Sequence, residues 1–571
     1  MLAWDDLVAR SVITSPVGGW KPLAIAAAVE AVLAGGKHKV ERREIGRSFE
    51  GRPIEMLVLG NGPKKAMMWS QMHGDEPTHT AMLLNLLKLL LEDDTPAERV
   101  LRGLTIGMIL PLNPDGAERN TRQNAQGIDV NRDALEFATP EGRAFRDTIL
   151  DFKPDYGFNL HNQGRRTAVA SPLGPASVSL LVPPLDPEDS QTDSVQEANR
   201  VAATFFERVR EACDGRVTRY DADFMARAFG EWVQRQGVSV ILVEAGGWPD
   251  ADFKRMEEVH FAAFVQTLDA IAATALGEPG GLEDCDPQNY LTLPRSSSYP
   301  QFDLLIRGAG VAQLSGEKAV VSKAELGVDF PGRMAGCAAM EGGTVAAIGD
   351  LHENGGLTTI ETPAVIAPGR IVLAEPTDDA FDESPADWET LSAKGATTVL
   401  IPINLGAGGV EAQVAAAKRL SPPLNAALVA TWDGEAPDKG LVLRRLTQGL
   451  AGGVVATLGP LPEKLVEACC RMGIPALDPA TTPTRSAPVP ATLDAWLRET
   501  RSVASQLGWN TRGEVMLNYP ADLVLIETPA DHAIAQDCLR AVYVGGTVVR
   551  DAAGLHHDSP GKWIPWGGPR G

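Results

Sequence analysis

Short apolar runs, most of them followed by a turn or a helix signal, recur along the first half of the chain. An apolar run bounded by turn residues is typical of a buried strand, whereas apolar residues spaced three and four apart are typical of a helix with one buried face. The predicted strands are 39–45, 55–59, one beginning at Ala66, 104–110, 155–160 and 238–243, and the predicted helices are 1–36, 78–91, one beginning near Pro140 and 194–213. The repeated order of strand and helix predicts an α/β fold with a doubly wound, mainly parallel sheet covered on both faces.

Turn and capping residues mark several boundaries between the predicted strands and helices. Gly46–Ile54 predicts a turn between two strands, and Asn113-Pro114-Asp115-Gly116 predicts a second turn. Ser194-Val195-Gln196-Glu197 has the spacing of a capping box at a helix start. The proline-rich segment 163–193 shows little periodicity, so we expect a long loop there.

The strand that begins at Ala66 leads into a His-x-x-Glu motif, His73 to Glu76, and then into a helix with Pro77 in its first turn. An imidazole and a carboxylate at a rigid strand-to-helix junction are suited to hold a metal ion. A turn with a helix-capping acid would have the same spacing, so the motif does not decide the matter alone. His79, on the following helix, is expected to lie near this site or on the surface without binding the metal.

Two further polar residues stand at the ends of predicted strands, His161 after 155–160 and Glu244 after 238–243. In open α/β sheets, ligands bind outside the carboxyl ends of the strands, where such residues converge. His73, Glu76 and His161 would then form the two-histidine, one-glutamate set of a catalytic zinc site, with one Zn²⁺ per chain and one position open. The alternative for His161 is a hydrogen-bonded histidine in a turn.

Composition limits the classes of partner. The 571 residues carry a net charge of −22, which argues against nucleic acid or an anionic membrane as a partner. Six cysteines lack Cys-x-x-Cys spacing and indicate reduced thiols. No signal-peptide pattern and no run of 18 or more apolar residues is found, so we expect a cytoplasmic protein.

Residues 40–275 resemble the zinc carboxypeptidases of the funnelin type, because several short motifs occur in that family's order. They are Gly46–Pro53, His73–Glu76, Asn113–Gly116, Gly127–Arg132, Leu160-His161 and Val243-Glu244. The resemblance implies that His73, Glu76 and His161 bind zinc. It also implies that Asp129 orients the first histidine and that Glu244 acts as general base.

The same resemblance assigns residues to the substrate. It implies that Asn131 and Arg132 hold the substrate's terminal carboxylate and that Arg119 polarises the scissile carbonyl. Tyr220 lies out of register with the tyrosine common in the family, so that role is left unassigned. The position that shapes the side-chain pocket falls near Gly230, which neither charges nor closes the pocket.

The second half of the chain has a different pattern. We expect a catalytic domain at 1–277, a linker at 278–300 and a companion domain at 301–571. Strand-rich segments at 301–374 and 512–555 resemble the composite β-sandwich of amidohydrolases, and flank an α/β insert at 375–511. That insert is too short for a full barrel and has no His-x-His at its start, so the companion domain is expected to be non-catalytic.

The resemblance implies a zinc-dependent metallocarboxypeptidase that cleaves a C-terminal peptide or peptide-like amide bond. The alternative is an N-acyl amino acid amidohydrolase of the desuccinylase or aspartoacylase kind, which shares the metal pattern. Either enzyme would take a peptide or an acyl amino acid with a free carboxylate. The sequence leaves open the side-chain preference, the role of the companion domain and whether the chain forms a homo-oligomer.

Overall fold

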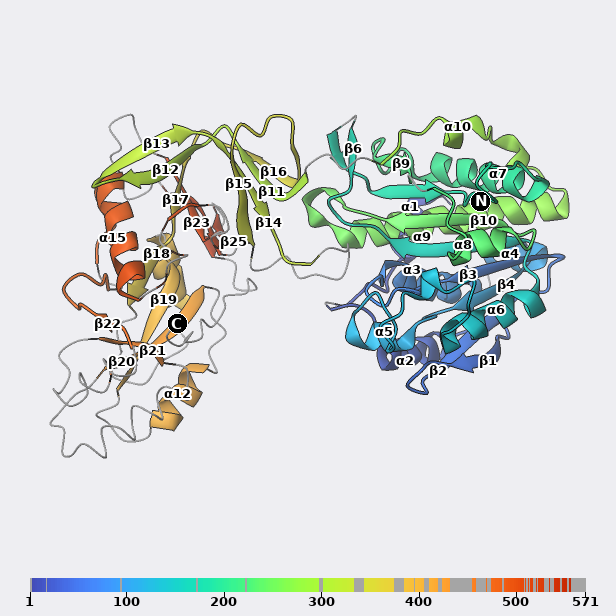
Figure 1. Cartoon of the computed structure of the whole chain (residues 1–571), viewed down its shortest axis with the longest axis horizontal. Coiled ribbons are helices and arrows are strands. Elements are labelled where there is room, and N and C mark those ends of the chain that lie inside the picture. Colours follow the sequence, from blue (N-terminus) through green and yellow to red (C-terminus); the bar gives the residue numbers. More distant parts are fainter. Residues whose placement is uncertain are drawn as a thin grey trace. The chain divides into compact units, whose positions relative to one another are not determined.

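The computed structural model describes residues 3–332 except 17, 93–94, 171–172, 221–222 and 297–300, then residues 343–373, and shorter stretches between 385 and 555. The chain divides into two compact units, one formed mainly by Met1–Gln301 and the other mainly by Phe302–Gly571. Figure 1 labels elements of both units where there is room, and each unit is described here by itself.

The N-terminal unit is built on an eight-stranded sheet. Its strands, from one edge to the other, are β1 (Glu41–Arg47), β2 (Pro53–Leu59), β4 (Leu104–Ile109), β3 (Lys64–Trp69), β5 (Tyr156–Asn162), β10 (Ser239–Ala245), β8 (Val178–Leu181) and β9 (Val217–Arg219). The four central strands β4, β3, β5 and β10 are parallel, and the antiparallel pairs are β1 with β2, β2 with β4, and β10 with β8. This is a mixed α/β unit with a large, mainly parallel sheet.

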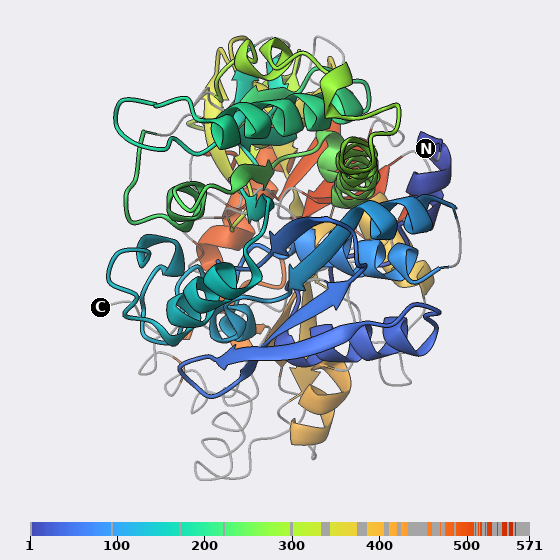
Figure 2. The same cartoon turned by 90° about the vertical axis from the view of Figure 1, so that its right-hand side faces the viewer.

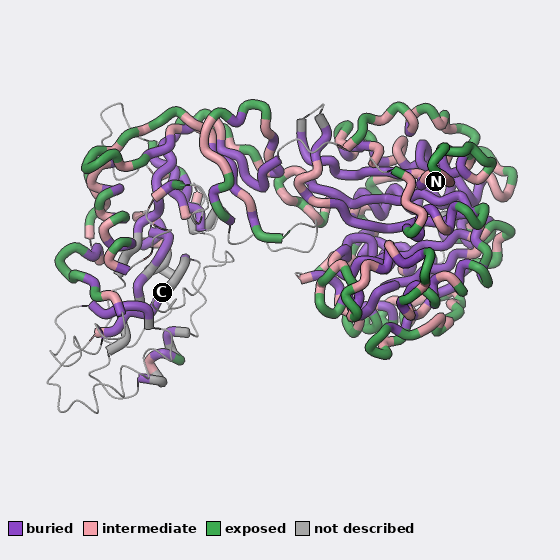
Figure 3. The backbone as a smooth tube through the Cα atoms, in the orientation of Figure 1, coloured by how far each residue is buried: buried purple, intermediate pink, exposed green. Residues whose placement is uncertain are grey.

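Helices cover both faces of this sheet, as Figure 2 shows with the N-terminal unit toward the viewer. One face packs against α1 (Trp4–Arg10), α2 (Pro22–Ala34), α3 (Thr78–Leu90), α4 (Thr95–Gly103), α7 (Asp193–Val209) and α9 (Phe253–Leu276). The other face packs against α6 (Pro140–Phe152) and α8 (Phe229–Gln234). The central strands are buried along their length and the outer turns are exposed (Figure 3).

Helix α9 is the core helix of this unit. Its 24 residues are apolar enough to cross a membrane by length and composition alone, but 83% of its most apolar window is buried inside the protein. Side chains such as Phe261, Phe264 and Leu268 pack into the large cluster beneath the sheet. The apolar composition of α9 is therefore explained by its packing.

Two predicted elements differ from the structure. The single helix expected at 1–36 is two helices, because Gly18 and Gly19 both have a positive φ, of 84° and 79°, which a helix cannot contain. The loop expected at 163–193 contains β6 (Ala168–Ala170), β7 (Leu173–Pro175) and β8. Strands this short contain too few residues for their alternation to be visible in the sequence.

Helix boundaries differ at two more places. Helix α7 is capped by Thr192, whose hydroxyl accepts from the Val195 N–H, so the cap lies two residues before the predicted Ser194. Part of the predicted linker is folded as η3 (Leu282–Asp284) and α10 (Gln288–Leu291). Tyr290 on α10 is 2% exposed and belongs to the core of the N-terminal unit, which the proline- and glycine-rich composition around it concealed.

The C-terminal unit has two mainly antiparallel sheets. One consists of β15 (Thr344–Gly349), β14 (Glu325–Asp329), β11 (Gln301–Arg307) and β16 (Gly355–Glu361); the other consists of β13 (Lys318–Lys323), β12 (Gly310–Ser315), β17 (Val365–Pro368), β23 (Leu523–Ile526), β24 (Leu539–Val544), β25 (Thr547–Asp551) and β26 (Gly554–Leu555). Both sheets contribute side chains to one hydrophobic cluster, Ile306 from the first and Leu525 from the second among them. The likeness to the amidohydrolase sandwich stays a prediction.

A third, parallel sheet follows the order β18 (Arg370–Leu373), β19 (Ala396–Asn404), β20 (Asn425–Thr431), β21 (Val454–Leu458) and β22 (Ala476–Leu477). It begins a few residues before the predicted insert at 375–511, because β18 pairs with β19. Its helices are α11 (Pro385–Ala393), α12 (Val410–Lys418) and α15 (Leu493–Gln506). The predicted start of the insert at Glu375 lies outside the described residues.

Candidate active site

The connection between β3 and α3 carries His73 and Glu76, and backbone contacts hold it in place. The Leu112 N–H donates to the Ser70 carbonyl and the Asn113 N–H donates to the Gln71 carbonyl, each over 3.0 Å. Gly74 lies directly against Gly116, and a Cβ on Gly74 would stand only 1.9 Å from the Gly116 carbonyl carbon. The connection is therefore packed against the residues after β4 at a distance that only glycine allows.

Those residues form a short helix where a simple turn was predicted. Helix α5 (Pro114–Arg119) starts at Asn113, whose side-chain oxygen accepts from the Gly116 N–H over 2.9 Å. The Asn113 amide also donates to the Met72 carbonyl over 3.2 Å, next to the ligand histidine. Asn113 thus caps the N-terminus of α5 and also holds the connection between β3 and α3 in place.

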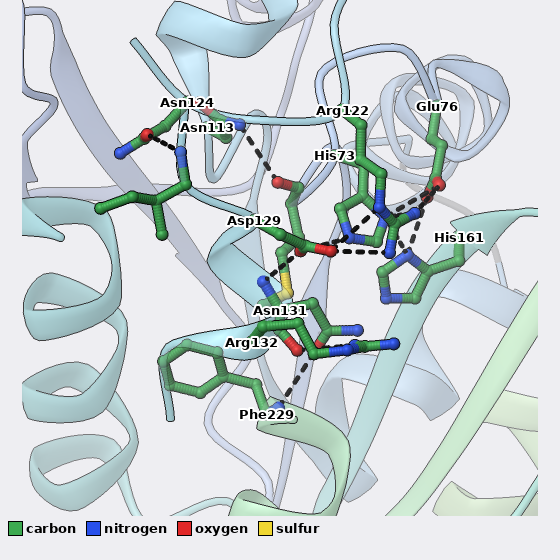
Figure 4. Close-up of polar contacts among 12 residues, drawn as sticks. His73, Glu76, Asn113, Arg122, Asn124, Asp129, Asn131, Arg132, His161 and Phe229 are labelled. Atoms are coloured by element: carbon green, nitrogen blue, oxygen red, sulfur yellow. Dashed lines mark hydrogen bonds and ion pairs between the residues drawn. The ribbon is translucent and has the colours of Figure 1, made fainter. Parts of the chain in front are cut away.

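The predicted ligand atoms converge at the carboxyl ends of β3 and β5 (Figure 4). Glu76 places one carboxylate oxygen 2.8 Å from His73 Nδ1 and the other 2.7 Å from His161 Nδ1, and the two nitrogens are 3.1 Å apart. Four ligands at zinc bond lengths of 2.0–2.1 Å would be separated by about 3.3 Å in a tetrahedron. The donor set and its spacing therefore fit a zinc ion with one position left open. Among the described residues, this is the one group of histidine, cysteine and acidic side chains arranged to hold a metal.

Asp129 supports His73 from behind. Its Oδ1 lies 3.0 Å from His73 Nε2, so a proton on Nε2 leaves the Nδ1 lone pair directed at the site. Burial alone would raise the pKa of Asp129, but the hydrogen bond with His73 and the charges of His73 and Arg122 hold that pKa well below its ordinary value. The orienting role predicted for Asp129 is compatible with this contact.

Burial and charge act in opposite directions on the three ligands. Burial lowers the pKa of His73, yet the Glu76 charge and the Asp129 hydrogen bond outweigh it and raise that pKa to about 9. Burial would raise the pKa of Glu76, but the charges of the two histidines bring it well below its ordinary range. The pKa of His161 is lowered, mainly by burial. Glu76 is thus held as a carboxylate, which is the form that binds a metal.

The structure does not bring Arg119 to this site. Its guanidinium pairs with Glu50 and donates to the Asp115 carbonyl over 3.2 Å, and its side chain is 42% exposed. The physical reason is that α5 ends at Arg119 and Asn120 takes the left-handed conformation, with φ 53° and ψ 51°, which turns the chain in a new direction. The sequence-based assignment of Arg119 is corrected on this ground.

Arg122, three residues later, is the arginine at the site. Its Nη1 lies 3.1 Å from His73 Nδ1 and 3.5 Å from a Glu76 oxygen, and its Nη2 lies 2.9 Å from Asp129 Oδ2 (Figure 4). Both arginines belong to the polar segment Glu118–Arg122, within which the sequence-based prediction named Arg119. A helix stop at an asparagine is the signal that would have favoured Arg122.

Asn131 and Arg132 lie in the short helix η1 (Val130–Arg132), next to Asp129. The Asp129 side chain accepts from the Asn131 N–H over 2.9 Å, and the Asn131 side-chain oxygen accepts from the Phe229 N–H over 3.0 Å. Asn131 therefore fixes the start of α8, and Arg132 donates to the Asn131 carbonyl over 2.8 Å. Their contact with a substrate carboxylate stays a prediction.

Glu244 lies on β10, and its Cα is the register partner of His161 on the parallel neighbour β5. Register partners on adjacent strands are about 4.8 Å apart and direct their side chains to the same face. The Glu244 side chain is therefore beside the metal ligand, in a largely enclosed position with 8% exposure. Its role as general base stays a prediction.

Residues 25–188 match the zinc carboxypeptidase family. Carboxypeptidase SOL1 of Arabidopsis thaliana is 26% identical over 136 residues, which cover 20% of this chain and 28% of that protein. Carboxypeptidase 2 of Trichophyton rubrum is 30% identical over 125 residues, which cover 20% of this chain and 23% of that protein. The chain thus spans about a quarter of the length of these curated relatives.

Solved structures give matches of the same kind. A metallo-carboxypeptidase from Pseudomonas aeruginosa, in complex with (2-guanidinoethylmercapto)succinic acid, is 23% identical, with a TM-score of 0.35 over 43% of this chain and 68% of that chain. Thrombin activatable fibrinolysis inhibitor is 14% identical, with a TM-score of 0.37 over 47% of this chain and 83% of that chain. Zinc carboxypeptidases use one Zn²⁺, for which the histidine and glutamate donors described above are suited. The match to the zinc carboxypeptidase family therefore covers residues 25–188, that is, the first part of the range 40–275 where the sequence motifs predicted a resemblance and the stretch just before it.

Proposed function

We propose that the N-terminal unit is a zinc-dependent carboxypeptidase, which hydrolyses the last peptide bond, or a peptide-like amide bond, of a substrate with a free carboxylate. The observation that carries this proposal is the convergence of two imidazole nitrogens and one carboxylate, from His73, His161 and Glu76, within 4.8 Å of one another. These three side chains would hold a zinc ion, which would supply Lewis-acid chemistry to water and to a carbonyl group.

Glu244 is the proposed general base. Its position beside His161 in the sheet supports this role, because a base must lie within hydrogen-bond reach of the water from which it takes a proton. The carboxylate accepts a proton from that water and delivers it to the nitrogen of the leaving amine. Its low exposure limits exchange of this proton with bulk water.

Arg122 is the proposed residue that stabilises the negative charge on the scissile carbonyl oxygen, in place of Arg119. Its guanidinium is close to His73 Nδ1 and Glu76, so a carbonyl directed at the metal would be within its reach. The bond from Asp129 fixes this guanidinium before substrate arrives, and a preorganised donor stabilises developing charge better than a mobile one.

Arg132 is the proposed contact for the terminal carboxylate, with Asn131 beside it. A planar guanidinium can donate two parallel hydrogen bonds to a carboxylate. With the terminal carboxylate bound by Arg132, only the last peptide bond of the substrate would lie at the metal ligands. Cleavage would therefore be restricted to the last residue.

The experiment compares one peptide as free acid and as C-terminal amide, with the zinc-loaded full chain. We expect release of the last residue from the acid, little reaction of the amide, and a selective loss on the acid in Arg132→Ala. Equal kcat/KM on both forms in the wild type would remove the carboxylate contact from the proposal. Activity confined to small acyl amino acids would favour the N-acyl amino acid amidohydrolase alternative.

A further inference from the structure

Asn159, in the middle of β5, is fully buried, with 0% exposure. Neither its side-chain oxygen nor its side-chain nitrogen has a hydrogen-bond partner among the described residues. A buried amide that lacks both bonds destabilises the fold, and such groups in native proteins call for an explanation. A group that binds only when substrate is present would explain it.

The position of Asn159 points to the substrate-binding face. Side chains two residues apart on a strand share a face, so Asn159 is on the same face as the ligand His161, about 6.6 Å away along the strand. The triad is enclosed to a similar degree, since His73, Glu76 and His161 are each 2% exposed. Asn159 is thus as buried as the three candidate metal ligands.

The other side of Asn159 faces helix α8. A Cβ placed on Gly230 would stand 3.4 Å from Asn159 Nδ2 and 3.1 Å from Pro183 Cγ, so the amide is in contact with the first turn of α8. That turn is tied to Asn131 by the bond from the Phe229 N–H, visible below Asn131 in Figure 4. Asn159 therefore lies near both the ligand candidate His161 and the turn of α8 that Asn131 holds.

A third unpaired group is carried by the neighbouring strand. Trp69 on β3 is the register partner of Asn159, is 0% exposed, and has an indole N–H without a partner among the described residues. Adjacent positions thus carry two unpaired donors and one unpaired acceptor. A carboxamide satisfies both kinds, since its oxygen accepts up to two bonds and its NH₂ donates. A carboxylate can use only the donors, and an aliphatic group can use neither.

We propose that Asn159 is a specificity-determining residue that binds the side chain of the substrate's C-terminal residue, and that it selects carboxamide side chains, asparagine or glutamine. This inference rests on the proposed carboxypeptidase function. A site with buried hydrogen-bonding groups discriminates against analogues that lack the matching group, because its own groups are then left unpaired.

The test uses N-blocked dipeptides that differ only in the last residue, with the zinc-loaded full chain. The comparisons are between side chains of similar shape, Gln with Glu and Met, and Asn with Asp and Leu. We expect kcat/KM for the amides to exceed that for the aliphatic partners by about tenfold or more. Equal rates within each set overturn the inference. If no residue is released from any peptide, the proposed function itself fails.

The variant Asn159→Leu separates recognition from a structural role. It removes the two unpaired atoms at similar volume, so we expect the amide preference to disappear while the thermal midpoint stays the same or rises. The matched control is Asn85→Leu. Asn85 is another buried amide, on α3, but its oxygen accepts from the Val12 and Ile13 N–H groups and its NH₂ donates to the Ile13 and Ala81 carbonyls.

Asn85→Leu should lower the thermal midpoint and leave the ratio of kcat/KM between amide and aliphatic substrates unchanged. Both effects are the opposite of those expected for Asn159→Leu. A lowered midpoint in Asn159→Leu together with an unchanged preference overturns the inference. Should Asn159→Leu not fold, Asn159→Ser provides a smaller change. Loss of the amide preference in that variant supports the inference, and retention overturns it.

Discussion

Two regions of the N-terminal unit supply side chains to the site. One is the carboxyl ends of β3, β5 and β10, and the other is the segment that follows β4. The two regions position their side chains in different ways. At the strand ends the sheet itself sets the position, as with Glu244 beside its register partner His161. In the segment after β4, one left-handed residue, Asn120, decides that Arg119 faces away and Arg122 faces the ligands. The pairing of β5 with β10 does not depend on the conformation of the loops around the site. The direction of Arg122, in contrast, depends on the conformation of one residue.

The largest expected effect tests the strand ends. Glu244→Gln keeps the size of the side chain but cannot accept the proton of water, so we expect kcat to fall by about 10² to 10⁴. Zinc content should stay at one per chain, because Glu244 is not among the three converging ligands. A variant that keeps more than about a tenth of the wild-type rate would contradict the role of Glu244 as base.

The segment after β4 is tested by a pair of arginine substitutions. With saturating zinc, we expect Arg122→Ala to lower kcat by about 10² to 10³, because one preorganised donor to the carbonyl oxygen is lost. Arg119→Ala is the matched control and should leave kcat within about twofold, since it loses an exposed pair with Glu50 and one bond to the Asp115 carbonyl. The reverse order of effects would restore the original assignment of Arg119.

Proton release on zinc binding tests the charge balance at the strand ends. Because the pKa of His73 is raised to about 9, this residue carries a proton at pH 7 that zinc must displace. Apparent zinc affinity should therefore fall by about tenfold for each pH unit below 9, as the protonated fraction grows. Chelator competition between pH 6.5 and 9 measures the slope, and a flat profile would show that His73 is neutral in the metal-free protein.

The smallest expected effect concerns the turn. Asn120→Ala places an ordinary side chain in the left-handed region and should lower the free energy of unfolding by about 1 kcal/mol. Asn120→Gly is the control, because glycine adopts this conformation readily. Denaturant titration of both variants gives the comparison. A loss in the glycine variant equal to that in the alanine variant would show that the asparagine side chain, and not its backbone, matters.

The same contrast explains what could be predicted from the sequence. Continuous apolar runs identified β3, β4, β5 and β10, and the parallel order of these strands then brought His73, His161 and Glu244 together without any knowledge of the loops. The sequence could not show that Arg122 and not Arg119 reaches the ligands, because both lie in one polar segment whose direction depends on the left-handed Asn120. The importance of Asn159 could not be predicted from the sequence. It depends on the absence of hydrogen-bond partners for its side chain among the described residues, which only the structure shows.

The facing glycines 74 and 116 have a consequence for sequence variation. A Cβ on Gly74 would overlap the backbone of Gly116, and a Cβ on Gly116 would come within 2.4 Å of the Asn113 side-chain nitrogen, so neither position admits a substitution even if the other changes. Neither glycine has a side chain that could bind a metal or transfer a proton. Relatives that have lost His73 or Glu244 and taken up another function should therefore still keep both glycines, whose constraint comes from space alone.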